Sequence, residues 1–317
     1  MPPPVGAASI VGVNTLSRLD GSAAVPAAQS WRSVLADYYE LGKPRIVFLL
    51  LITTAAAMIM AARGLPPPQL LLWTLLGGAL SAASAGAYNC VIDRDVDRIM
   101  LRTRMRPVAT GRIPVRHAVI AASSAGLAGF TILYALVNPL AAWLSLAGNL
   151  FYVVVYTLLL KRRTPQNIVI GGAAGAVPPL VGWAAVTHQI GMPALGLFAI
   201  IFLWTPPHFW ALALIANADY DKAGIPMFPN VYGIERTKRE ILFYTLILVG
   251  VSLTLVDIHV MGAIYGIAAT VLGAIFVYYA VKLSQDETRR WARGLFKFSL
   301  LYLALICVAM VIDRIFT

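Results

Sequence analysis

The chain of 317 residues is 59% hydrophobic and only 12% charged, with a formal net charge of +11 and a mean hydropathy of +0.77. A soluble domain would carry about twice that charged share. The composition therefore excludes an ordinary soluble domain and indicates an integral membrane protein.

The N-terminal segment, residues 1–30, is rich in Ala, Pro, Gly and Ser and is predicted to be disordered. It lacks the apolar core of a signal peptide. Arg18 and Arg32, with few acids nearby, also fit a mitochondrial transit segment, although a bacterial membrane protein is the simpler interpretation. Residues 31–45 are predicted to form an interfacial helix whose Trp and Tyr side chains suit the headgroup layer.

Residues 31–317 form one predicted membrane domain. A membrane-spanning helix needs roughly 20 apolar residues, so the uncharged windows 118–160 and 164–218 must each hold two helices. The expected fold is all-α, with nine helices around a central cavity. These helices lie near residues 46–63, 69–91, 117–137, 140–160, 166–187, 194–216, 240–257, 260–282 and 296–314.

The basic residues are distributed unevenly between the two sides of these helices. Of the 25 Lys and Arg residues, 23 lie in the N-terminal segment or in the connections after helices 2, 4, 6 and 8. This positive-inside pattern predicts a cytoplasmic N-terminus, an external C-terminus and a location in the bacterial inner membrane. The positive charge thus reports topology and contact with anionic lipid, and no nucleic-acid partner is expected. Cys90 and Cys307 fall on opposite sides, so neither a disulfide nor a zinc site is expected.

An acidic cluster, YNCVIDRDVDRIMLRTRMRP (residues 88–107), follows the second apolar run. Asn89, Asp93 and Asp97 are spaced i, i+4, i+8, so on a helix they share one face about 12 Å long, whereas Asp95 points elsewhere. Three of the chain's 14 acidic residues lie here within five positions, and five arginines are interleaved with them or follow. The alternative is a solvated helix end whose acids pair with the arginines. Hard oxygen ligands beside arginines favour Mg²⁺ and a diphosphate, in a membrane most plausibly a lipid diphosphate.

A second polar stretch, residues 208–233, begins with His208 and continues with Asp219, Asp221 and Lys222. It is predicted to face the same side of the membrane as the acidic cluster. The two stretches are therefore expected to close over one diphosphate, with two metal ions between them. The alternatives are that His208 is a buried histidine with its hydrogen bonds made inside the protein, and that Asp219 and Asp221 are surface loop residues without a functional role.

Several strings together resemble the UbiA superfamily of intramembrane prenyltransferases. NxxxDxxxD followed by RTRMRP, with KPR ahead of the first helix, carries the superfamily resemblance. TPQNIVIGGAAGAVPPLVGW, TPPHFWALA and DYDKAGIPM are similar to its branch that farnesylates protohaem IX. The resemblance covers residues 37–315. Many superfamily members have a second DxxxD-type motif, where this chain offers His208 and then Asp219-Tyr220-Asp221.

The resemblance implies farnesyl diphosphate and haem b as substrates, Mg²⁺ as cofactor, and transfer to the haem 2-vinyl group with addition of water. It also implies a haem A synthase that consumes the product. His208 would orient haem, bind its iron or assist proton transfer. The residues themselves suggest the roles: Asn89, Asp93 and Asp97 are the expected metal ligands, with Asp219 or Asp221 opposite. The expected substrate-binding residues are Lys43, Arg102, Arg106, Asp221 and Lys222.

Two other functions fit parts of the sequence. Another member of the superfamily would attach a prenyl chain to a quinone precursor, although the branch-specific strings argue against this. An ion-coupled transporter would also place acids in the membrane. A transporter would more often carry them near the midplane, whereas these acids lie at one boundary.

Overall fold

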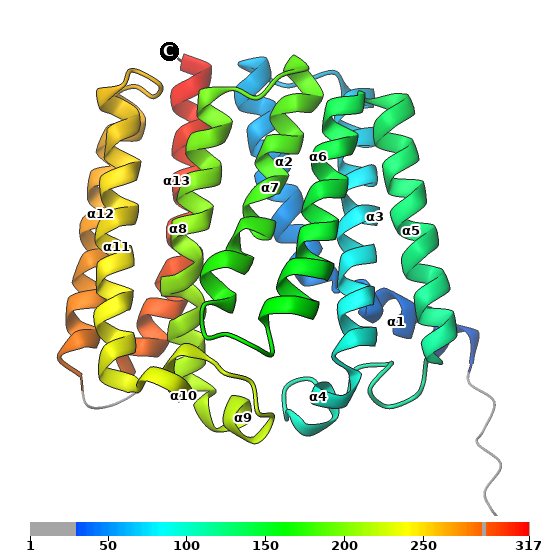
Figure 1. Ribbon diagram of the computed structural model, residues 1–317. Coiled ribbons are helices and arrows are strands. Elements are labelled where there is room, and N and C mark those ends of the chain that lie inside the picture. The colour runs from blue at the N-terminus through cyan, green and yellow to red at the C-terminus, as the bar shows by residue number, and fades with distance from the viewer. Residues whose placement is uncertain (1–29, 287–289, 317) are drawn as a thin grey trace, which may run out of the picture.

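The computed structural model describes residues 30–286 and 290–316, which form an upright bundle of helices without a strand (Figure 1). Nine helices in this part of the chain are long and apolar enough to cross a membrane, as the sequence predicts. They are α2 (Pro44–Ala62), α3 (Pro68–Ile92), α5 (Val115–Leu136), α6 (Pro139–Leu150) with its continuation η1 (Phe151–Leu160), α7 (Asn167–Thr187), α8 (Met192–Ile215), α11 (Ile234–Asp257), α12 (Ala263–Ser284) and α13 (Arg290–Phe316). The shorter helices are α1 (Trp31–Leu41), α4 (Arg94–Ile99), α9 (Asn217–Lys222) and α10 (Phe228–Tyr232).

Proline and polar caps determine where several spans begin. Pro44, Pro68 and Pro139 occupy the first turns of α2, α3 and α6, where a missing N–H costs nothing. Asn138 caps α6 by accepting a hydrogen bond from Ala141 N at 2.9 Å, and its side-chain amide donates to a carbonyl of α7. The same asparagine therefore starts one span and attaches it to the next.

Four spans contact one another in a closed cycle at the centre of the bundle: α2 with α7, α7 with α8, α8 with α13, and α13 with α2. The spans α7 and α8 are the most buried. Gly182 permits the close contact between α2 and α7, because a Cβ atom there would lie 2.3 Å from the carbonyl oxygen of Thr54. Helices α3, α5 and α6 lie on one side of this group, and α11 and α12 on the other (Figure 1). A cavity within the bundle stays a prediction.

Helix α1 has the amphipathic surface expected of an interfacial helix. Trp31, Leu35 and Tyr39 are exposed on it, whereas Asp37 and Leu41 are buried. Asp37 accepts a hydrogen bond from Arg112 at 2.8 Å, which attaches α1 to the connection after α4. The segment predicted to be disordered lies outside the described residues, apart from Ser30, whose side chain caps α1.

The two polar stretches lie at the same end of the bundle. Helices α1, α4, α9 and α10 gather at the lower end in Figure 1, while α13 ends at the opposite side. The expected placement of the two polar stretches on one side is thus confirmed. Among the described residues, Cys90 and Cys307 are buried and free.

The topology can be tested with reporter fusions. Fusions at residues 110, 163 and 230 should report the cytoplasm, because the connections that contain these residues are rich in Lys and Arg. Fusions at residues 66 and 190, in connections poor in Lys and Arg, should report the outside. Paired alkaline phosphatase and green fluorescent protein fusions at each position provide the measurement. An external signal at residue 230 alone would separate the two polar stretches and contradict a shared site.

Candidate functional site

The acidic cluster lies where α3 passes into α4. Asp93 joins the two helices with φ −90° and ψ 7°, and its N–H still bonds to Asn89 O at 2.9 Å. The N–H of Asp97 bonds in turn to Asp93 O at 2.7 Å, so the chain keeps an almost helical path. Asn89, Asp93 and Asp97 are buried, with exposed fractions of 3%, 0% and 2%. The Asp95 side chain is 63% exposed, as the spacing predicts.

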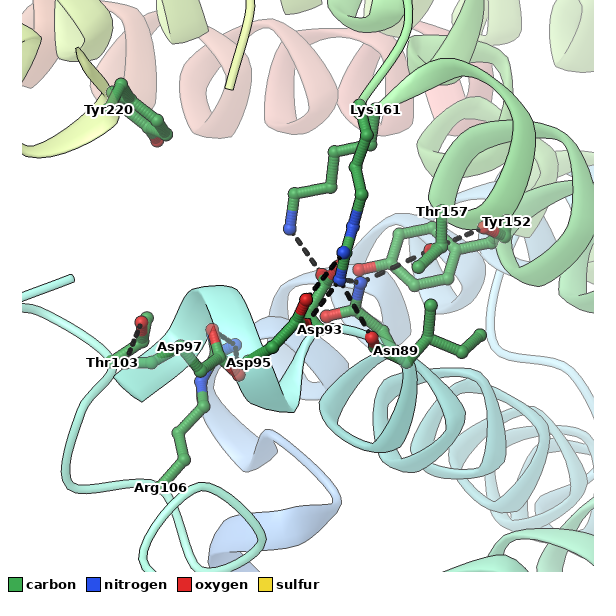
Figure 2. A network of polar contacts seen from close by, with 12 residues as sticks. Asn89, Asp93, Asp95, Asp97, Thr103, Arg106, Tyr152, Thr157, Lys161 and Tyr220 are labelled. Atoms are coloured by element: carbon green, nitrogen blue, oxygen red, sulfur yellow. Dashed lines mark hydrogen bonds and ion pairs between the residues drawn. The ribbon is translucent and has the colours of Figure 1, made fainter. Parts of the chain in front are cut away.

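The carboxylate of Asp93 is contacted by polar side chains from α3 and from the connection that follows η1 (Figure 2). Lys161 forms an ion pair with Oδ2, and Asn89 donates to the same oxygen at 2.7 Å. Oδ1 lies 3.5 Å from a nitrogen of Arg162 and accepts no hydrogen bond, although it is buried. One oxygen of Asp93 is therefore bound by protein groups, while the other keeps most of its capacity for a ligand.

The other two aspartates each bind an arginine. Asp97 accepts two hydrogen bonds from Arg106, at 2.7 and 2.8 Å. Asp95 accepts two from Arg162, at 2.6 and 2.7 Å, and this hydrogen bonding lowers the pKa of Asp95 to about 2. Arg162 uses two nitrogens in a planar fork, which is geometrically specific, whereas Arg106 reaches both oxygens of Asp97 through one nitrogen, Nη1. Every aspartate of the cluster is therefore paired with a basic side chain.

Lys43 reaches the cluster from the connection between α1 and α2. Its Nζ donates to Asn89 Oδ1 at 2.5 Å, and burial lowers the pKa of Lys43 to about 8. The backbone of Lys43 is left-handed, with φ 55° and ψ 57°, which costs roughly 1–2 kcal/mol for a residue with a Cβ atom. Such residues cluster at functional sites, although Arg63 and His188 adopt the same conformation here as ordinary helix C-caps.

Sequence reasoning missed Lys161 and Arg162 as members of the site. They belong to the KRR string that directly follows the fourth span, on the side of the membrane predicted for the acids. A run of cations at a span end usually reports only topology, which explains why they were not singled out. Their position opposite the aspartates depends on how η1 packs beside α3.

The second polar stretch contacts the first through its short helix α9. Asp219 accepts a hydrogen bond from the backbone N–H of Leu101 at 3.3 Å. Arg102 Nη2 donates to the hydroxyl oxygen of Tyr220 at 3.5 Å. Figure 2 shows Tyr220 across a gap from the Asp93 network. The expected approach of the two stretches is thus present at Asp219. Asp221 and Lys222 are exposed on α9.

His208 lies apart from these acids, in the contact between α8 and α13. Its ring stacks on Trp204 and Phe296, with centroids 4.2 and 4.7 Å away. Its Nδ1 lies 2.7 Å from Ser299 Oγ. Because the single proton of Ser299 is donated to Phe296 O at 2.7 Å, Ser299 must accept from His208. The neutral ring therefore carries its proton on Nδ1 and has an acceptor lone pair on Nε2.

The donor atoms of the cluster suit Mg²⁺. Among the described residues, no three His, Cys, Asp or Glu side chains lie close enough to form a metal-binding group. Mg²⁺ usually binds one or two carboxylates and completes its shell with water and phosphate oxygens. The uncommitted Oδ1 of Asp93 and the amide oxygen of Asn89 are hard donors that fit this requirement.

The sequence matches the UbiA prenyltransferase family over residues 50–306. The protohaem IX farnesyltransferase of Rippkaea orientalis is 51% identical over 297 residues, which cover 93% of this chain and 92% of that protein. The protohaem IX farnesyltransferase of Gloeobacter violaceus is 55% identical over 285 residues, which cover 90% and 93%.

Solved structures share the architecture at much lower identity. The structure of a digeranylgeranylglyceryl phosphate synthase superposes with a TM-score of 0.77 at 18% identity and covers 90% of this chain and 100% of that one. A UbiA homologue from Archaeoglobus fulgidus, bound to DMAPP and Mg²⁺, superposes with a TM-score of 0.61 at 20% identity and covers 86% and 99%. These likenesses show the fold.

The geometry predicts unequal roles for the three aspartates. Asp93→Asn and Asp97→Asn should weaken the binding of Mn²⁺ with pyrophosphate about tenfold or more, because each removes a buried anionic donor. Asp95→Asn should change it only a few-fold, because an exposed ion pair contributes about 0–1 kcal/mol. Electron paramagnetic resonance of free Mn²⁺ measures the affinities. Equal losses at all three positions, with unchanged thermal unfolding, would contradict the assignment.

Proposed function

The chain belongs to the UbiA prenyltransferase family, and from this premise we propose that it transfers the farnesyl group of farnesyl diphosphate to haem b. Two relatives at 51% and 55% identity, each matched over nine-tenths of its length, are protohaem IX farnesyltransferases. The observation that carries the proposal is the buried Asn89–Asp93 pair, which faces basic side chains from other segments.

The basic side chains around the acids are the proposed ligands of the diphosphate. Lys43 and Arg106 were expected from the sequence, and Lys161 joins them through its ion pair with Asp93. Arg102, beside Tyr220, would reach the diphosphate from the side of the second polar stretch. Lys222, which is exposed, would contact the diphosphate at the outer edge of the site. A phosphate binds well to several cations held in fixed directions.

Mg²⁺ is the proposed cofactor. Asn89, Asp93 and Asp97 would hold it on one side, with Asp219 or Asp221 opposite. The A. fulgidus homologue with the same fold binds DMAPP and Mg²⁺, which supports this pair of ligands. When bound, Mg²⁺ would neutralise the charge that develops on pyrophosphate as the allylic C–O bond breaks.

The residues of this chain then have separable tasks. Lys43, Arg106 and Lys161 hold the leaving pyrophosphate by charge-assisted hydrogen bonds, which strengthen as its negative charge grows. The farnesyl group must react away from water, because its cation would otherwise be captured by solvent. Aromatic faces such as those of Tyr152 and Tyr156, whose centroids lie 5.3 Å apart with the rings tilted by 34°, would stabilise that cation.

His208 is proposed to act on the haem side. A neutral ring with its proton directed at Ser299 has an Nε2 lone pair that would bind the haem iron or hold a water molecule. In this protonation state it does not donate a proton from Nε2. The stacking of Trp204 and Phe296 fixes the plane of the ring, so the direction of the lone pair is fixed as well.

The proposed location is the bacterial inner membrane, with the diphosphate site at the cytoplasmic face. The positive-inside pattern supports this orientation. A haem A synthase is the proposed consumer of the product.

The function is tested by the haem that accumulates. Cells that express the protein, but have no other enzyme of this kind, should contain a haem heavier than haem b by a farnesyl group plus a hydroxyl. Mass spectrometry of extracted haem gives the mass, and purified protein with farnesyl diphosphate and haem b should release pyrophosphate. Prenylation of an aromatic acid in place of haem b would favour the quinone-precursor alternative.

Isotope labelling tests the course of the reaction. Attack by the terminal carbon of the vinyl group leaves a cation on the carbon beside the pyrrole, where the macrocycle delocalises it. Capture of that cation by water, with loss of one proton to solvent, would place a hydroxyl on that carbon, next to the new chain. Turnover in ¹⁸O-labelled water should therefore raise the product mass by about two units per molecule, the ¹⁸O–¹⁶O difference left by this single addition. An unlabelled product would contradict water capture.

A further inference from the structure

The fourth span changes its winding just before it reaches the acidic cluster. Helix α6 ends at Leu150, and η1 continues for ten residues as a π-helix. The wider turn is seen at its end, where the N–H of Lys161 bonds to the carbonyl of Tyr156, five residues back, at 2.8 Å. π-helical turns are rare and occur frequently at functional sites.

Thr157 is the fully buried residue of this segment, and its hydroxyl follows the wider turn. Its Oγ1 donates to the carbonyl of Tyr152, also five residues back, at 2.9 Å. Buried threonines in the α-helical spans, such as Thr74 and Thr245, bond four residues back instead. Because a hydroxyl has one proton, Thr157 can only accept from Asn89 Nδ2, which lies 3.2 Å away (Figure 2).

Three groups therefore orient the amide of Asn89. Lys43 binds its oxygen, and Asp93 and Thr157 bind its nitrogen. An ammonium only donates and a carboxylate only accepts, so the amide is fixed with its oxygen toward Lys43. Lys43 and Asp93 are charged and belong to the proposed diphosphate and metal ligands. Thr157 is neutral and is held by the backbone of its own helix.

We propose that Thr157 is a positioning residue that keeps the oxygen of Asn89 directed at the metal while Lys43 and Asp93 bind the substrate and the cation. The proposal rests on the proposed function only in requiring a metal–diphosphate complex at Asn89. The π-helical winding orients Thr157 for this role. It directs the Thr157 hydroxyl proton to Tyr152 O and leaves a lone pair of Thr157 Oγ1 facing Asn89 Nδ2.

Burial makes this contact difficult to replace. Asn89 and Thr157 have exposed fractions of 3% and 0%. Removal of the hydroxyl would leave one amide N–H of Asn89 without its partner, and both N–H groups when Asp93 turns to the metal, which favours rotation of the amide. Outer partners of metal ligands typically contribute ten- to a hundredfold, as an order of magnitude, to metal affinity.

The experiment compares Thr157→Val, which keeps the shape, with Thr157→Ser, which keeps the hydroxyl, in the full-length protein. Mn²⁺ with inorganic pyrophosphate is the probe, and electron paramagnetic resonance of free Mn²⁺ gives the affinity. Thr157→Val should bind Mn²⁺ about tenfold more weakly than the wild type, and Thr157→Ser should stay within about twofold. Thr74→Val is the matched control, because Thr74 is fully buried on α3 but bonds only to Leu70 O.

Three results would overturn the proposal: wild-type affinity in Thr157→Val, equal weakening in Thr157→Ser, or equal weakening in Thr74→Val. Thermal unfolding of each variant shows whether a loss follows from misfolding, and the serine variant keeps the comparison valid if Thr157→Val unfolds. A wild-type protein that transfers no farnesyl to haem would contradict the proposed function. The Mn²⁺ pattern would still support the positioning role in that case.

Discussion

Asp93 carries a carboxylate with no exposed surface at the end of a membrane span. Removing an ionised group from water costs at least several kcal/mol unless opposite charges and hydrogen bonds replace the water. Asn89 supplies one partner from α3 itself, and the adjacent Lys161 and Arg162 supply the others from the connection that follows η1. The buried charge therefore ties the end of α3 to the end of the fourth span, 68 residues away.

The same requirement explains two departures from regular backbone. Lys43 adopts a left-handed conformation at the start of α2, and the fourth span widens into a π-helix before Lys161. Each directs a side chain at Asn89 or at its neighbour Asp93. Gly171 assists η1, because a Cβ atom there would lie 2.2 Å from the ring of Tyr156. These two departures bring Lys43 and Lys161 to the acidic cluster, whereas the other left-handed residues, Arg63, His188 and His259, lie at or just after helix ends elsewhere.

Hydropathy and charge were sufficient to predict the nine spans and the common side of the two polar stretches, because both depend on local composition. The shared face of Asn89, Asp93 and Asp97 was predictable from helical spacing, which survives the change of direction at Asp93. The pairing of Asp97 with Arg106 matches the acid–arginine alternative, but the basic partner of Asp93 was not predictable. Asp93 forms its ion pair with Lys161, 68 residues away, because η1 packs beside α3. The sequence of η1 contains no signal that predicts its π-helical winding. The roles assigned to His208, Asp219 and Asp221 stay predictions.

The charges of the cluster distinguish a site for an anion from a path for a cation. A cation pathway needs carboxylates that the ion can reach, yet all three aspartates here already bind basic groups. Four cations around three carboxylates leave one positive charge in excess, which favours an anionic ligand. The cations are Lys43, Arg106, Lys161 and Arg162, and the carboxylates are Asp93, Asp95 and Asp97. A diphosphate that draws the cations away would free the carboxylates for Mg²⁺, so each ligand would favour the other, and neither would bind tightly alone.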